Sequence, residues 1–177
     1  MSEEGEKLVR VLYHLNWTTF SRNASNNYNS PRVVLYINIR LLQLHFSLRN
    51  DIFDHRDILC IFFFNCSSIY FLVNIYSDLS QTALKYLNNT KANINSILIM
   101  IGDFNIRDSS WNSNFPHHSI HSDLTDIVDS MNLCMLRSTN QVPTRYSDNK
   151  NDSNSVIDLM FLRSDSSELD NHMIYLK

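Results

Sequence analysis

The chain has 177 residues, of which 44% are hydrophobic and 19% charged, and its formal net charge is −3. A chain of this length and composition can bury a core as one globular unit, which excludes a fully disordered protein and a fold that depends on disulfides. The net negative charge disfavours binding to the negatively charged backbone of a nucleic acid, although it does not exclude a local basic groove.

The amino-terminal segment and the cysteines indicate an intracellular protein, nuclear or cytoplasmic, that is not secreted. The first seven residues are acidic and lack the basic start and apolar core of a signal peptide. The most hydrophobic stretch, residues 58–76, is interrupted by polar side chains, so we expect no membrane helix. The three cysteines, Cys60, Cys66 and Cys134, form no CxxC pair and are expected to be reduced thiols.

The first half of the chain predicts strands joined by a hairpin. Residues 1–30 are weakly patterned and are expected to form a surface loop or a frayed terminus. Residues 33–37 and 58–64 are short runs of β-branched and aromatic residues, which are typical of buried strands. Residues 65–68 predict a tight turn, after which residues 70–76 form the returning strand.

A helix and a central strand are predicted next. Asp78, followed by Gln81 three residues later, resembles a capping box and predicts a helix over residues 79–88. Its apolar stripe would consist of Leu79, Ala83, Leu84 and Leu87. Residues 97–101 are all apolar, as expected of a strand covered on both faces. This order predicts a crossover between two parallel strands.

The last third of the chain predicts one more helix and one more strand. Ser122 can cap a second helix, whose apolar stripe would consist of Leu124, Ile127, Val128 and Met131. Residues 138–155 are polar and typical of a loop, and residues 156–161 predict a buried strand that contains Asp158. We find no repeat and no second domain, so the expected fold is mixed α/β with layered packing.

Gly102-Asp103-Phe104-Asn105 follows the predicted central strand directly, where open α/β sheets bind ligands. Glycine permits a tight turn or a close approach of backbone. Asp103 and Asn105 would project to the same side if strand geometry continued past the glycine. A carboxylate and an amide placed in this way can orient a water molecule and hold a phosphate oxygen, although both residue types are also ordinary turn formers.

This tetrapeptide resembles the GDFN signature of the endonuclease/exonuclease/phosphatase superfamily. Two further matches occur in the family's order: Asn74-Ile75-Tyr76 resembles its N-x-Y element, and Ser155-Val156-Ile157-Asp158 resembles its S-x-I-D strand. The surrounding residues 76–78, 108–111 and 143–146 resemble the reverse-transcriptase-linked subgroup carried by non-LTR retrotransposons. The resemblance implies a layered α/β sandwich of the deoxyribonuclease-like type over residues 31–177.

The resemblance also implies an activity and roles for particular residues. The activity is hydrolysis of a DNA phosphodiester assisted by Mg²⁺ or Mn²⁺, without a small-molecule cofactor. Asp103 would orient and deprotonate the attacking water, while Asn105 would hydrogen-bond the phosphate or the nucleophile. Tyr76 would contact the phosphate, and Asp158 would orient a histidine through its ring N–H.

Two parts of the family pattern have no recognisable counterpart here. The family's metal-binding glutamate lies upstream in a Q-E element, but the upstream glutamates are Glu3, Glu4 and Glu6, and no Gln-Glu pair occurs. The family ends on an S-D-H triplet, whereas the histidine that follows Asp158 is His172, preceded by Asp-Asn. We therefore expect a copy that lacks the first and last strands and has weak or no nuclease activity, with no assigned metal ligand and His172 as a secondary catalytic candidate.

Two other interpretations remain open at this stage. An active phosphodiesterase that recruits unrecognised ligands requires an acidic residue near Asp103 and Asn105. A non-catalytic remnant that binds nucleic acid or protein requires a basic groove. Arg145 and Thr144, in the polar loop, are candidates for contact with a DNA phosphate, although simple solvation also explains an exposed arginine.

Histidines and a tryptophan lie outside these motifs. His117 and His121 have the spacing of a helical zinc pair, and His118 lies between them. A solvated loop is the favoured interpretation because no glutamate accompanies them and they follow Pro116. Trp111 is expected to pack in the core and not to stack on a base. The oligomeric state does not follow from the sequence.

Overall fold

The structure is a computed structural model that describes residues 15–21, 32–41, 45–65, 68–90, 97–112, 120–136, 143–146 and 154–164. Within these ranges, six strands form one sheet in the order β3-β4-β5-β6-β8-β7, and β1 and β2 form a separate antiparallel ribbon. The strands are β1 Trp17–Ser21, β2 Val34–Asn38, β3 His45–Leu48, β4 Ile58–Asn65, β5 Ser68–Tyr76, β6 Ile97–Asp103, β7 Leu133–Met135 and β8 Asp158–Arg163. The helices are the 3-10 turn η1 Ile39–Leu41, α1 Thr82–Thr90 and α2 Ile120–Ser130.

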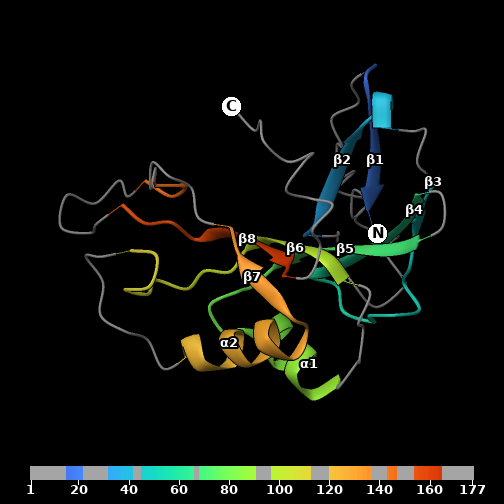
Figure 1. Cartoon of the computed structure of the whole chain (residues 1–177). Coiled ribbons are helices and arrows are strands. Elements are labelled where there is room, and N and C mark those ends of the chain that lie inside the picture. The colour runs from blue at the N-terminus through green and yellow to red at the C-terminus, as the bar shows by residue number, and fades with distance from the viewer. Residues whose placement is uncertain are drawn as a thin grey trace, which may run out of the picture.

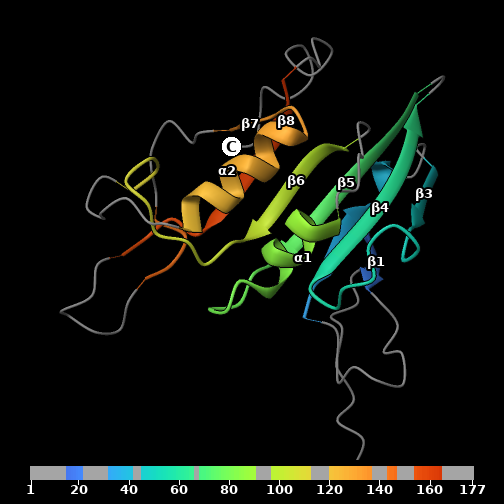
Figure 2. The same cartoon turned by 90° about the horizontal axis from the view of Figure 1, so that it is seen from below.

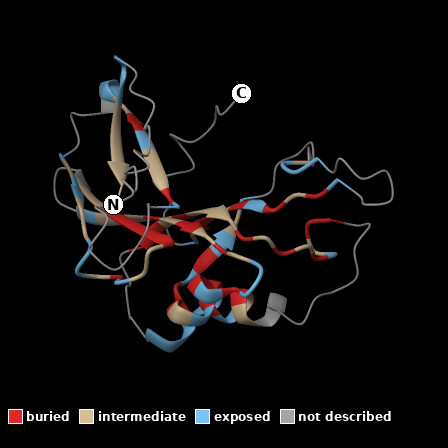
Figure 3. Cartoon of the chain, turned by 180° about the vertical axis from the view of Figure 1, so that it is seen from behind, coloured by how far each residue is buried: buried red, intermediate tan, exposed pale blue. Residues whose placement is uncertain are grey.

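Two layers cover opposite faces of the six-stranded sheet. Helices α1 and α2 lie together on one face, and the β1–β2 ribbon rises from the other (Figures 1 and 2). Buried residues concentrate between the helices and the sheet (Figure 3), where Leu84 and Leu124 belong to the larger core. A smaller core joins Val33, directly before β2, and Ile37 of β2 to Leu59 and Ile61 of β4. The predicted mixed α/β class with layered packing is confirmed.

The connections around the central strand follow the sequence pattern. β4 and β5 pair antiparallel with Asn65 opposite Ser68, which confirms the predicted hairpin. β5 and β6 run parallel on either side of the connection through α1, which confirms the crossover. β6 lies between β5 and β8, so the apolar run of residues 97–101 occupies the interior of the sheet.

The first helix begins later than its apolar pattern predicts. α1 starts at Thr82 because Gln81 has a φ of 56°, which lies in the left-handed region and cannot continue a right-handed helix. The capping-box prediction for Gln81 is therefore wrong. Asp78 alone caps the helix, with its Oδ1 accepting the N–H of Thr82 at 3.1 Å. Leu79, predicted on the apolar stripe, precedes the helix and is 88% exposed.

Other boundaries also differ from the pattern. α2 begins at Ile120, so Ser122 lies inside the helix and does not cap it, whereas the predicted apolar stripe of α2 is buried. β8 begins at Asp158, two residues later than predicted. β1 lies within the weakly patterned residues 1–30, and neither β3 nor β7 was predicted. Among the described helices, none has the length and apolar character that a membrane span requires.

Candidate active site

Tyr76, Asp103 and Asp158 form one row across the sheet. Asp103 is the register partner of Tyr76 in the parallel pair β5–β6 and of Asp158 in the antiparallel pair β6–β8. Directly paired residues of neighbouring strands point to the same face. Tyr76 packs against the smaller core beneath the ribbon, so all three side chains belong to the ribbon face of the sheet. Three residues taken from three separate motifs therefore come together at the end of β5 and β6.

Gly102 allows β6 to approach β5 closely at the register position next to this row. A Cβ built on Gly102 would lie 1.8 Å from the carbonyl oxygen of Ile75, and the glycine has a φ of 149°, which L-residues rarely adopt. Both the space and the backbone conformation therefore require glycine. The close backbone approach expected from the sequence is present, and it sets the position of the neighbouring Asp103.

The chain turns sharply after Asp103. The carboxylate of Asp103 accepts the backbone N–H of Asn105 at 2.9 Å, and Asn105 has a φ of 49°. Asparagine is among the few residues with a side chain that adopt this left-handed conformation readily. Strand geometry does not continue to Asn105, so the condition under which Asp103 and Asn105 would project to the same side is not met. The Asn105 amide instead donates to the carbonyl oxygen of Ser77 at 2.6 Å.

A buried polar pair supports this turn from the segment before α1. The side-chain amide of Gln81 donates to the carbonyl oxygen of Phe104 at 3.3 Å, and the hydroxyl of Ser77 donates to Gln81 Oε1. The backbone N–H of Ser77 also donates to the carbonyl oxygen of Asp103 at 2.7 Å. Sequence reasoning missed the role of Gln81 because a glutamine three residues after an aspartate resembles a helix cap, and no pattern in the sequence indicates the role of Ser77.

A second set of polar contacts fixes the segment that leads into β8. The side-chain amide of Asn112 bonds both backbone groups of Val156, accepting its N–H at 2.8 Å and donating to its carbonyl at 2.9 Å. The hydroxyl oxygen of Thr144 accepts the N–H groups of Ile157 and Asp158 at 3.0 and 3.1 Å. Thr144, predicted as a contact to DNA phosphate, thus holds the backbone at Asp158. No pattern in the sequence indicates this role for Asn112.

The remaining predicted residues have varied positions. Arg145 is exposed, and its backbone forms an isolated antiparallel bridge with Ser155. Trp111 is 9% exposed and donates its ring N–H to the carbonyl oxygen of Ile106 at 3.3 Å, which confirms a packing role. His117, His118 and His172 lie outside the described residues, and His121 is part of α2.

The electrostatics of the row are unfavourable for two ionised carboxylates. Burial raises the pKa of Asp103, the N–H of Asn105 opposes that shift, and the charge of Asp158 adds to it. A carboxyl with a raised pKa is a better proton acceptor from water than an ordinary one. The two carboxylates and a nearby amide oxygen are also the donor types that Mg²⁺ takes. Within the described ranges, no three His, Cys, Asp or Glu side chains are grouped as a metal site.

A third acidic residue, close to the row, was missed by sequence reasoning. Asp57, directly before β4, is 1% exposed and is paired with the guanidinium of Arg32. The same guanidinium lies over the ring of Tyr76, with its central carbon 4.9 Å from the ring centroid. No pattern in the sequence relates Arg32 to Asp57, because 25 residues separate them.

Comparisons with known proteins agree with this geometry. The endonuclease domain of TRAS1, a telomere-specific non-LTR retrotransposon, superposes with a TM-score of 0.63 at 18% identity, over 87% of this chain and 70% of that chain. This likeness shows a shared fold. A search of curated proteins found no match. The profile of the endonuclease-reverse transcriptase family matches residues 64–175, a range that contains all three motifs, and the chain therefore belongs to the endonuclease-reverse transcriptase family.

Proposed function

We propose that this domain hydrolyses DNA phosphodiesters with the help of a divalent cation, at a low rate because the family's Q-E glutamate and S-D-H triplet have no recognisable counterpart in the sequence. The observation that carries the proposal is the single row formed by Tyr76, Asp103 and Asp158, with Asn105 held beside it. The family's name and the endonuclease function of the TRAS1 domain agree with this chemistry. The row offers a hydroxyl and two carboxylates on the ribbon face of the sheet, with the Asn105 amide in the turn that follows.

Each side chain has a role that its environment favours. Asp103 would accept a proton from the attacking water, because its pKa is raised by burial and by Asp158. Asn105 and Tyr76 would hold the phosphate. Asp158 would supply a carboxylate oxygen to Mg²⁺ or Mn²⁺. When bound, the cation supplies positive charge that stabilises the negative charge developing on the phosphate.

A second candidate is a module that binds nucleic acid without cutting it. Affinity for DNA would then come from contacts to phosphates and would fall steeply with salt concentration. The exposed Arg145 is a candidate for such a contact.

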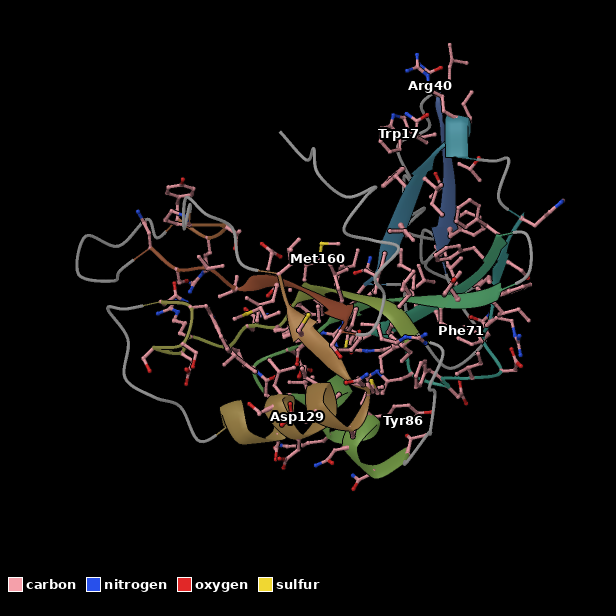
Figure 4. All side chains as sticks on the ribbon, viewed as in Figure 1. Trp17, Arg40, Phe71, Tyr86, Asp129 and Met160 are labelled. Atoms are coloured by element: carbon pink, nitrogen blue, oxygen red, sulfur yellow. The ribbon has the colours of Figure 1, made fainter. Side chains whose placement is uncertain are left out.

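A plasmid-nicking assay with Mg²⁺ or Mn²⁺ tests the first proposal. We expect the purified chain to nick supercoiled DNA, and we expect Asp103→Asn or Asn105→Ala to reduce the rate by about 100-fold or more. Asp129→Asn is the matched control, because Asp129 is exposed on α2 on the far side of the sheet (Figure 4). Equal nicking by Asp103→Asn and wild type would refute the assignment, and salt-dependent binding without nicking would favour the second candidate.

A further inference from the structure

Arg32 connects three parts of the molecule at the edge of the site. It lies two residues before β2 and donates from Nε to Oδ1 of Asp57 at 2.6 Å and from Nη2 to Oδ2 of the same carboxylate. Nη2 is also 3.4 Å from Oδ2 of Asp78, the residue that caps α1. The guanidinium carbon lies 4.9 Å from the centroid of the Tyr76 ring.

The pair with Asp57 gives the guanidinium a fixed orientation. Asp57 is 1% exposed, so its carboxylate has little freedom to move, and two parallel hydrogen bonds match the planar fork of an arginine. The backbone of Asp57 contributes as well, since its carbonyl oxygen accepts the N–H of Tyr76 at 2.9 Å. Asp57 therefore restrains Tyr76 twice, once through the backbone and once through Arg32.

The charge of Arg32 is already matched by its neighbours. Asp57 and Asp78 both contact the guanidinium, and these contacts raise the pKa of Arg32, with the hydrogen bond to Asp57 as the largest cause. An arginine held between two carboxylates is poorly suited to capture a phosphate for itself. Its remaining face covers the Tyr76 ring, where a cation is attracted to the π electrons.

We propose that Arg32 is a positioning residue, fixed by Asp57, that holds the ring of Tyr76 in the orientation needed beside Asp103. The proposal deepens the function proposed above and rests on it for the catalytic consequence. The restraint on the ring is a property of the folded chain and can be measured without DNA.

The ring restraint is tested by fluorine NMR on protein that carries 3-fluorotyrosine, with the Tyr76 resonance identified by its loss in Tyr76→Phe. Arg32→Lys keeps a positive charge for Asp57 but loses the fork, and we expect it to shift or split the Tyr76 resonance. Arg49→Lys is the matched control, because Arg49 also forms a double hydrogen bond to an aspartate and lies over a ring elsewhere. A Tyr76 resonance that is the same in Arg32→Lys and wild type overturns the proposal.

The catalytic consequence is tested by a double-mutant cycle in the Mg²⁺-dependent nicking assay. We expect Arg32→Lys to lower kcat by about 10- to 100-fold through misplacement of the ring, and to have no further effect in the Tyr76→Phe background. An equal loss of kcat in both backgrounds, together with a slope of log DNA affinity against log salt concentration that is smaller by about 1, would mean that Arg32 contacts a phosphate directly. That result would overturn the positioning role.

Failure of the two proposals gives different results. If the wild-type chain does not nick DNA but Arg32→Lys changes the Tyr76 resonance, the proposed function is refuted. The restraint of the ring by Arg32 then still stands. If the chain nicks DNA but the Tyr76 resonance is the same in Arg32→Lys and wild type, the proposed function stands and the positioning role of Arg32 is refuted. Asp57→Asn gives an independent check, because it weakens the hold on Arg32 without touching the arginine and should shift the same resonance.

Discussion

Substitution of Gly102 by alanine tests how strictly the site depends on the approach of β6 to β5. The new Cβ would lie 1.8 Å from the carbonyl oxygen of Ile75, well inside van der Waals contact, and its neighbour is backbone that cannot rotate away. A side chain at a φ of 149° costs about 1–3 kcal/mol in backbone strain. Forced displacement of packed neighbours costs about 1–3 kcal/mol more. We therefore expect Gly102→Ala to reduce the free energy of unfolding by about 2–6 kcal/mol.

Urea unfolding followed by far-UV circular dichroism measures this loss. With a slope of about 2 kcal/mol per molar urea, the midpoint should fall by about 1–3 M. Ser109→Ala, at an exposed position of the following loop, is the control and should leave the midpoint unchanged. A Gly102→Ala midpoint within about 0.3 M of wild type at equal slope would refute the reasoning, because the strands would then separate locally at little cost.

Three further predictions concern buried groups. Asn112→Ala removes two hydrogen bonds to the backbone before β8 and should cost about 2–3 kcal/mol in urea unfolding, whereas an unchanged midpoint would show that water replaces the amide. The raised pKa of Asp103 means that this carboxyl binds a proton more readily in the folded state than in the unfolded state, so its own contribution to stability is complete below the usual aspartate pKa and is lost as pH rises through the folded pKa. Asp103→Asn should remove that loss and raise the urea midpoint at neutral pH, and a lowered midpoint would contradict the sign. Burial raises the pKa of the Cys60 thiol to about 12, so iodoacetamide at pH 8 should label the exposed Cys134 before Cys60. Mass spectrometry measures the two labelling rates, and equal rates would show that β4 opens.

The central part of the fold was predictable because its signals are local. An apolar run, a polar turn and an amphipathic stripe each specify one element from neighbouring residues, and this holds for β4, β5, β6 and the buried stripe of α2. Strands of only three to five residues, such as β1, β3 and β7, are too short for an alternating pattern to stand out, and they were not predicted. The start of α1 was misjudged because Gln81 adopts a left-handed conformation that contacts from Ser77 and Phe104 support.

The sequence by itself determined the class of the fold, the family and the residues at the centre of the site. Gly102, Asp103 and Asn105 lie within one short motif, and that motif's chemistry depends on residue type and spacing alone. Only the tertiary structure decided how Tyr76 and Asp158 align with Asp103, because strand register is set by pairing between segments far apart in the chain. The hydrogen-bond partners that support the site were also decided by the tertiary structure. Buried polar groups bond to residues that are distant in the sequence, so these pairs leave no pattern along the chain.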